Sequence, residues 1–221
     1  MRRAALLAAL LAASPLHARV LDLHCEIRVA KSGELRVTER ITLEAAKDTP
    51  RLERELPREA RVVELLRDGH PEGFAVDGAR LRVGAPPREG RHLYQLTYRA
   101  ARRVAFLADH DALHWNLKGA ERMTAEVILP VSVPARQIKL EGSGAEWQSL
   151  VRDGRAAFRA QAPLALTVRF PKGVVAEPGM GERARWLFSD YFGFVLLAVA
   201  LGLTAWTLMQ FKKLSNSGSG S

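Results

Sequence analysis

The clearest hydropathy pattern in the chain is an alternation of apolar and polar residues across positions 21–43. Two runs with a period of two, 21–29 and 35–43, flank Lys31-Ser32-Gly33-Glu34. A period of two places successive side chains on opposite faces of a strand, and a glycine-containing stretch between two such runs is typical of a hairpin. The pattern therefore predicts a β-hairpin with one buried face. Glu39 is the one polar residue on that face, which predicts either a place at the sheet rim or an arginine partner.

Short extended runs continue to residue 170, and Asp-Gly pairs follow or separate several of them. Asp-Gly supplies the positive φ that tight hairpin turns need. About ten or eleven strands at this spacing are typical of an antiparallel β-sandwich. The later runs lie at 61–66, 74–76, 81–83, 92–100, 104–107, 113–117, 123–129, 138–140, 147–151, 156–158 and 164–170. For residues 51–56 we expect a short turn of helix instead.

The first 18 residues have the pattern of a secretory signal peptide. Arg2 and Arg3 precede an apolar run of ten residues, Ala4 to Ala13, which is too short to cross about 30 Å of hydrocarbon. Ala18 offers a cleavage point, although Leu16 is larger than the residue usually found there. The alternative to a cleaved signal is an uncleaved anchor.

A second apolar run, Tyr191 to Met209, has 19 residues without a charge. A helix of that length measures about 28 Å, enough to cross a bilayer. Trp186 and Trp206 lie near its ends, where aromatic residues favour the interface, and basic residues follow at 212–213, on the side expected to be cytoplasmic. We therefore predict a transmembrane helix at 186–211.

Together the two ends predict a single-pass protein of the bacterial inner (cell) membrane with its C-terminus in the cytoplasm. The predicted parts are a signal peptide (1–18), an extracytoplasmic β-sandwich domain (19–173), a linker (174–185), the membrane helix (186–211) and a short cytoplasmic tail or flexible linker (212–221). Roughly 160 residues are enough for one domain with a core. Cys25 is the single cysteine, so no intramolecular disulfide is possible, and its inward phase predicts a buried, inert thiol.

The net charge of +9 is concentrated partly at the two ends. Without the basic residues of the signal and the membrane flanks, and without Asp190, 28 basic and 23 acidic side chains remain, which leaves +5 for the domain. Such a charge keeps a domain soluble and favours anionic surfaces weakly. Nucleic acid is not an expected partner, because an exported domain meets none and no recognition motif occurs.

Five segments appear in a particular order along the domain: Ser32-Gly33-Glu34-Leu35, Arg54-Glu55-Leu56-Pro57, His114-Trp115-Asn116, Leu129-Pro130 and Phe170-Pro171-Lys172-Gly173-Val174. In this order they resemble the YciQ-like predicted membrane proteins, a family without established chemistry. The resemblance implies an extracytoplasmic, sandwich-like domain fixed to the membrane, and it implies no activity. Many members continue with further membrane segments, so this chain is expected to be a short member or a truncated piece.

Asp109, His110, Asp111 and His114 form the densest group of chemically active side chains. Imidazole and carboxylate together suit a divalent metal, but the spacing matches no common zinc pattern, and a solvated loop explains the group as well. Trp115 with Asn116 is interpreted as structural, with ligand stacking as the alternative. The sequence contains no serine nucleophile elbow, phosphate-binding glycine loop or paired-cysteine site. We therefore assign no catalytic, cofactor-binding or metal residues.

Three hypotheses for function follow. The first, which we prefer, is a membrane-anchored binding or accessory module that contacts another envelope protein or the wall polymer and is not an enzyme. The second is an envelope hydrolase or metal-binding enzyme using the Asp109–His114 loop. The third is an accessory subunit that makes its main contact through the small residues Gly193, Ala198, Gly202 and Ala205 of the membrane helix. No cofactor is expected, and the oligomeric state stays open.

Overall fold

The computed structural model describes residues 19–142, 146–152, 155–161, 165–181, 183–186, 191–192, 197–204 and 206–207. The predicted signal peptide lies outside the described residues. The chain divides into two compact units, Met1–Glu177 and Pro178–Ser221, which are described separately.

Within its described residues the first unit consists mainly of β-strands, which form three sheets. In spatial order, the eight-stranded sheet contains β13 (Glu146–Arg152), β14 (Arg155–Gln161), β11 (Arg122–Ile128), β1 (Arg19–Val29), β2 (Leu35–Ala45), β8 (Gly90–Ala100), β4 (Arg61–Arg67) and β5 (His70–Pro71). The four-stranded sheet contains β12 (Lys139–Gly142), β15 (Ala165–Pro171), β10 (His110–Asn116) and β9 (Val104–Phe106). The three-stranded sheet contains β3 (Glu53–Glu55), β7 (Arg80–Val83) and β6 (Phe74–Asp77), and a short 3₁₀ turn, η1, spans Ala135–Gln137. The prediction of a mainly β domain is confirmed.

The predicted hairpin is present as β1 and β2. Their antiparallel register pairs Ile27 with Val37 and Leu23 with Ile41, and all four side chains are buried. The turn is closed by a hydrogen bond from the Ala30 amide to the Glu34 carbonyl, at 2.8 Å. The alternation of the sequence therefore produces one buried face, as expected.

Two expectations about the strands need correction. Residues 53–55 form strand β3, which pairs Arg54 with Leu81, and not a turn of helix. A segment of six residues is too short to hold a helix by itself, so the pairing partner decides its conformation. The sheet is also not purely antiparallel, because β1 and β11 run parallel, with Cys25 opposite Ala125. The alternation of apolar and polar residues along a strand does not reveal which strand pairs with it, or whether the two run parallel or antiparallel.

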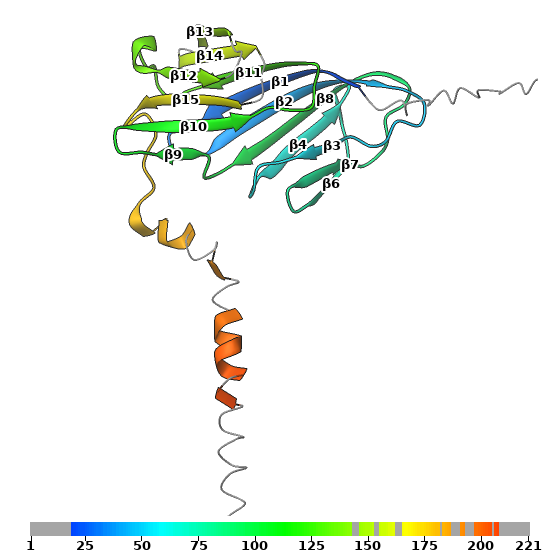
Figure 1. Cartoon of the computed structure of the whole chain (residues 1–221). Coiled ribbons are helices and arrows are strands. Elements are labelled where there is room, and N and C mark those ends of the chain that lie inside the picture. The colour runs from blue at the N-terminus through cyan, green and yellow to red at the C-terminus, as the bar shows by residue number, and fades with distance from the viewer. Residues whose placement is uncertain are drawn as a thin grey trace, which may run out of the picture. The chain divides into compact units, whose positions relative to one another are not determined.

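One buried cluster joins the three sheets. It includes Ile27 and Tyr98 of the eight-stranded sheet, Leu113 and Phe170 of the four-stranded sheet, and Leu81 of the three-stranded sheet. In Figure 1 the strands β9, β10, β15 and β12 cross one end of the largest sheet, while β3, β7 and β6 lie near its other end. The core therefore draws side chains from all three sheets.

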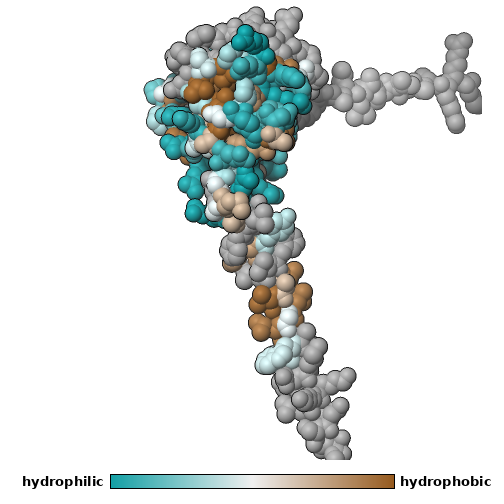
Figure 2. Space-filling model, turned by 90° about the vertical axis from the view of Figure 1, so that its left-hand side faces the viewer, coloured by the Kyte–Doolittle hydropathy of each residue, from teal (hydrophilic) through white to brown (hydrophobic). Residues whose placement is uncertain are grey.

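The described parts of the second unit include helical residues 183–186, 191–192, 197–204 and 206–207. Among the described residues, no helix has both the length and the apolar character needed to span a membrane. Residues 187–190, 193–196, 205 and 208–211 of the predicted span lie outside the described residues, as does the predicted tail, 212–221. Gly193 and Ala205 of the third hypothesis therefore fall outside as well. Figure 2 shows hydrophobic atoms gathered along the described part of this unit. Its exposed large apolar side chains include Leu197, Val199, Leu201, Leu203 and Trp206.

Candidate functional site: a pocket at the start of strand β10

Four residues were candidates for one site: Asp109, His110, Asp111 and His114. Their side chains do not meet, because successive residues of β10 point to opposite faces of the sheet. Asp111, like Leu113 and Trp115, is buried on the core side of the strand. His110 and His114 have the opposite phase and are less buried. The loop therefore brings only Asp109 and His110 together.

Asp111 and His114 each have a structural partner on the β15 side. The Lys172 ammonium lies 2.9 Å from Asp111 Oδ1, and Lys172 also lies over the Phe106 ring, 5.7 Å from its centroid. His114 Nδ1 is 2.9 Å from Thr167 Oγ1, its cross-strand neighbour. Both contacts connect β10 with the last strand of the domain or the residues that follow it, so we assign Asp111 and His114 a structural role.

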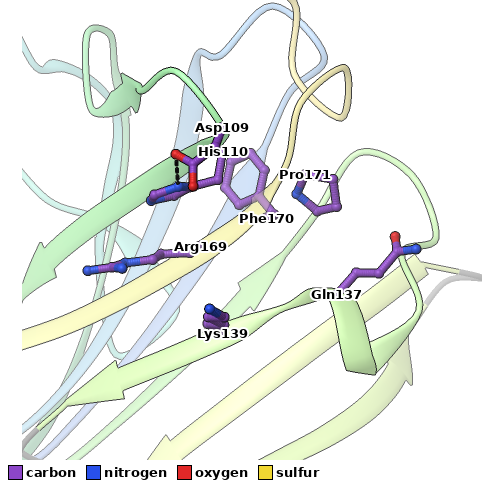
Figure 3. Close-up of a pocket in the computed structure, with 7 residues that line it drawn as sticks. All are labelled: Asp109, His110, Gln137, Lys139, Arg169, Phe170 and Pro171. Atoms are coloured by element: carbon purple, nitrogen blue, oxygen red, sulfur yellow. Dashed lines mark hydrogen bonds and ion pairs between the residues drawn. The ribbon is translucent and has the colours of Figure 1, made fainter.

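Asp109 and His110 form a hydrogen-bonded pair at the β9–β10 turn. His110 Nδ1 lies 2.7 Å from Asp109 Oδ1, and Figure 3 marks this contact with a dashed line. The hydrogen bond from His110 lowers the pKa of Asp109, so this carboxylate stays ionised at neutral pH. The Asp109 side chain is 83% exposed, whereas that of His110 is 22% exposed. The imidazole is thus held in one orientation by a solvated carboxylate.

This pair borders a pocket of about 270 Å³. The pocket is lined by Asp109, His110, Gln137, Lys139, Arg169, Phe170 and Pro171. Lys139 of β12 and Arg169 of β15 are direct cross-strand neighbours, so their side chains leave the same face of the sheet. Glu141 Oε2 lies 3.0 Å from Arg169 Nη2, and within the described residues Lys139 forms no ion pair. The two cations thus face two carboxylates, Asp109 and Glu141, and Lys139 is the charge left to attract an anion to the pocket.

Gln137, Lys139 and Arg169 were not predicted as site residues. They come from segments about 30 and 60 residues further along the chain than Asp109. The one available signal was the alternation around 138–140, which implies that Lys139 faces away from the core.

Within the part of the chain that the structure describes, no group of three or more His, Cys, Asp or Glu side chains is arranged to hold a metal ion. The two other residues weighed from the sequence are buried. Cys25 is fully buried, and burial raises the pKa of its thiol well above the usual value, which agrees with the predicted inert thiol. Trp115 belongs to the core cluster, in agreement with its structural interpretation.

Comparisons with known proteins show a likeness of fold alone. No family model and no curated protein sequence matches the chain. A mutant M1 zinc metallopeptidase from Deinococcus radiodurans, solved with a Tyr-Ser-Ala substrate, is similar with a TM-score of 0.51 and 15% identity, over 80% of this chain and 54% of that one. Native yeast LTA4 hydrolase is similar with a TM-score of 0.50 and 11% identity, over 69% of this chain and 29% of that one. The chain thus spans about half or less of the proteins that it resembles.

The prediction that the protein is not an enzyme is wrong in the light of this likeness. It rested on motifs missing from the sequence, but the fold is one that zinc metallopeptidases and an LTA4 hydrolase contain. A domain can belong to an enzyme without carrying its catalytic motif, so missing motifs are not grounds for excluding one. The 221 residues contain no His-Glu-x-x-His sequence, the motif by which many metalloproteases hold zinc.

Proposed function

We propose that this chain forms the peptide-binding β-domain of a membrane-anchored hydrolase of the bacterial cell envelope. The pocket at Asp109–His110 receives an acidic segment, either of another envelope protein or of the peptide part of the wall polymer. The observation that carries the proposal is the pair of neighbouring cations, Lys139 and Arg169, beside the Asp109–His110 pair (Figure 3). Carboxylates are natural ligands for such a group, because arginine offers a planar fork of N–H donors and lysine adds a compact charge.

The likeness to a peptidase solved with a Tyr-Ser-Ala substrate supports peptides as the ligand class. The core shared by the three sheets supports a sandwich-like, rigid scaffold under the pocket. The exposed apolar side chains of residues 197–206 support a membrane helix, since such a surface is unfavourable in water. The resemblance to the YciQ-like proteins points to the same compartment.

A second candidate role is acid–base chemistry by His110 itself. Its hydrogen bond to Asp109 orients the ring, as a carboxylate does for a catalytic histidine. His110 Nε2 is buried and has no hydrogen-bond partner among the described residues, so the ring or its neighbours must shift before this nitrogen takes a proton from a substrate.

The test is a binding and cleavage assay on the full chain in detergent micelles. A Glu-rich peptide should bind, and its counterpart with Gln in place of Glu should bind weakly. Joint replacement of Lys139→Gln and Arg169→Gln should weaken binding about tenfold, since each exposed cation contributes about 0.5–1 kcal/mol. Arg91→Gln, which removes an exposed arginine of β8, is the matched control and should change nothing.

Mass spectrometry of the same mixtures reports cleavage. Cleavage that disappears in His110→Gln while binding persists would establish the second role. Equal binding of both peptides, or binding that the double variant leaves unchanged, would refute the proposed site.

A further inference from the structure

A second pocket, of about 190 Å³, lies at the other end of β10 from the first. Its walls include Glu39 of β2, Arg54 of β3, Tyr98 of β8, and Trp115 and Asn116 of β10, together with Arg103 from the loop between β8 and β9. Two segments far apart in the sequence, Arg54 to Pro57 and Trp115-Asn116, therefore meet in one place.

The floor of this pocket is a hydrogen-bonded charge pair. Arg54 Nε lies 2.6 Å from Glu39 Oε2, and the Tyr98 hydroxyl donates to Glu39 Oε1 at 2.9 Å. Arg54 Nη1 donates in addition to the Lys118 carbonyl, at 3.1 Å. Both carboxylate oxygens of Glu39 are thus engaged and its charge is balanced by Arg54, which leaves a rigid and nearly neutral floor.

Arg103 is the cation on the wall that lacks a counter-charge. Its guanidinium lies over the Trp115 ring, 5.5 Å from the centroid. Its Nε is buried without a hydrogen-bond partner, and the described residues offer it no ion pair. The other cation at the rim, Lys118, is bound to Glu55 at 2.7 Å. A guanidinium without a counter-charge favours an added negative group on this wall.

We propose that this pocket binds a small ligand that carries a carboxylate next to an apolar group, such as the C-terminal residue of a peptide. The carboxylate lies against the Arg103 guanidinium above the Trp115 ring, the apolar group packs against Pro57 at the rim, and the Asn116 amide supplies a further polar contact. The volume is below the roughly 300–1,000 Å³ of pockets for drug-sized ligands, so the occupant is about the size of one residue. The site is separate from the Asp109–His110 pocket and does not depend on it.

The probes are N-acetyl-leucine and N-acetyl-leucinamide, which differ only in the carboxylate. We expect the full chain in detergent micelles to bind the acid, with a shift of a tryptophan indole N–H signal, and to bind the amide at least about tenfold more weakly, as loss of a charge-assisted hydrogen bond predicts. This comparison uses the unaltered protein. Absence of saturable binding, or equal binding of acid and amide, overturns the proposal.

Two variants and a control locate the binding site. Arg103→Gln should reduce affinity for the acid about tenfold, whereas Arg169→Gln in the other pocket should leave it unchanged. If Arg103→Gln does not fold, Arg103→Lys keeps the charge, removes the fork and should give an intermediate loss. Binding that is insensitive to Arg103 but lost on Arg169→Gln would place the acid in the first pocket and refute this one.

Discussion

At the scale of single residues, Glu39 shows how a charged side chain is accommodated in the core. It is 3% exposed and its partner Arg54 lies in a different sheet, so the arginine alternative inferred from the sequence is confirmed. Both oxygens accept hydrogen bonds, which offsets part of the desolvation of the charge.

We expect Glu39→Leu to lower the free energy of unfolding by about 3–5 kcal/mol, because it leaves a buried guanidinium without its partner. The double variant Glu39→Leu, Arg54→Met should lower the free energy of unfolding by clearly less, since it removes both charges. Chemical denaturation at neutral pH measures both. Glu53→Leu, which breaks exposed pairs of β3, serves as control and should change stability by less than about 1 kcal/mol. Strictly additive losses for Glu39 and Arg54 would contradict this coupling.

Two hydrogen-bond acceptors favour the charged form of His92. Nδ1 lies 2.7 Å from Asp68 Oδ2 and Nε2 lies 2.9 Å from the Arg88 carbonyl, so both ring nitrogens act as donors only when the imidazole is protonated. The hydrogen bond to Asp68 raises the pKa of His92 above its ordinary value. Partial burial opposes ionisation of Asp68, but the hydrogen bonds from His92 and from the Leu93 amide outweigh it and lower the pKa of Asp68.

This contact should make stability depend on pH. A histidine whose pKa is raised in the folded state adds stability that is fully present below its unfolded pKa, about 6.5, and lost as pH rises through the higher folded value. The free energy of unfolding should therefore fall as pH rises above about 6.5 in the wild type, and it should fall less in His92→Gln. The same slope in both proteins would show that His92 does not cause it.

At the scale of elements, the turn between β1 and β2 determines how the central hairpin closes. Gly33 has a φ of +84°, in the region that side chains with a Cβ rarely adopt. A Cβ at this position would also lie 3.3 Å from Val175 Cγ1, where the chain leaves the domain toward the second unit. The turn therefore has little room for a side chain on both conformational and steric grounds.

We expect Gly33→Ala to destabilise the domain by about 1–2 kcal/mol or more, the usual strain of a left-handed residue plus the contact with Val175. Gly78 is a useful comparison, because its φ is +58° but nothing lies within 4 Å of a Cβ placed there. Gly78→Ala should show only the loss of stability that comes from backbone strain. Comparing the thermal unfolding of the two variants then separates this strain from the cost of the contact with Val175. A smaller effect at Gly33 than at Gly78 would show that the contact with Val175 adds no cost.

At the scale of the whole molecule, the two units differ in what they expose. In the first unit, the buried apolar residues of the three sheets that the structure describes share one core. In the second, the large apolar side chains of residues 191–206 that the structure describes are exposed. A helix with apolar residues on all sides is stable in a lipid environment, which is why we propose that this unit anchors the domain.

The proposed topology predicts how protease acts on spheroplasts. Protease added from outside should digest the β-domain and leave a small membrane-bound fragment, because we expect residues 19–185 outside and Lys212 inside. A chain ended after Glu177 should appear in the periplasmic fraction. Full protection of the β-domain, or membrane association of the shortened chain, would contradict the topology.

Features that depend on neighbours in the chain could be read from the sequence. The hairpin of β1 and β2 follows from a period of two and a glycine turn, and the burial of Cys25 follows from its phase in the first strand. The sequence left two possibilities for Glu39, a place at the sheet rim or an arginine partner, because a carboxylate needs either water or a cation to stabilise its charge.

Features that depend on which strands become neighbours were decided only by the tertiary structure. The parallel pairing of β1 with β11, the strand at 53–55 and the meeting of Lys139 with Arg169 all require contacts between segments far apart in the chain. The same holds for the Arg103 guanidinium over Trp115. Hydropathy records which side of a strand is buried, whereas the identity of its neighbour is set by the packing of the whole domain, and both pockets are built from such neighbours.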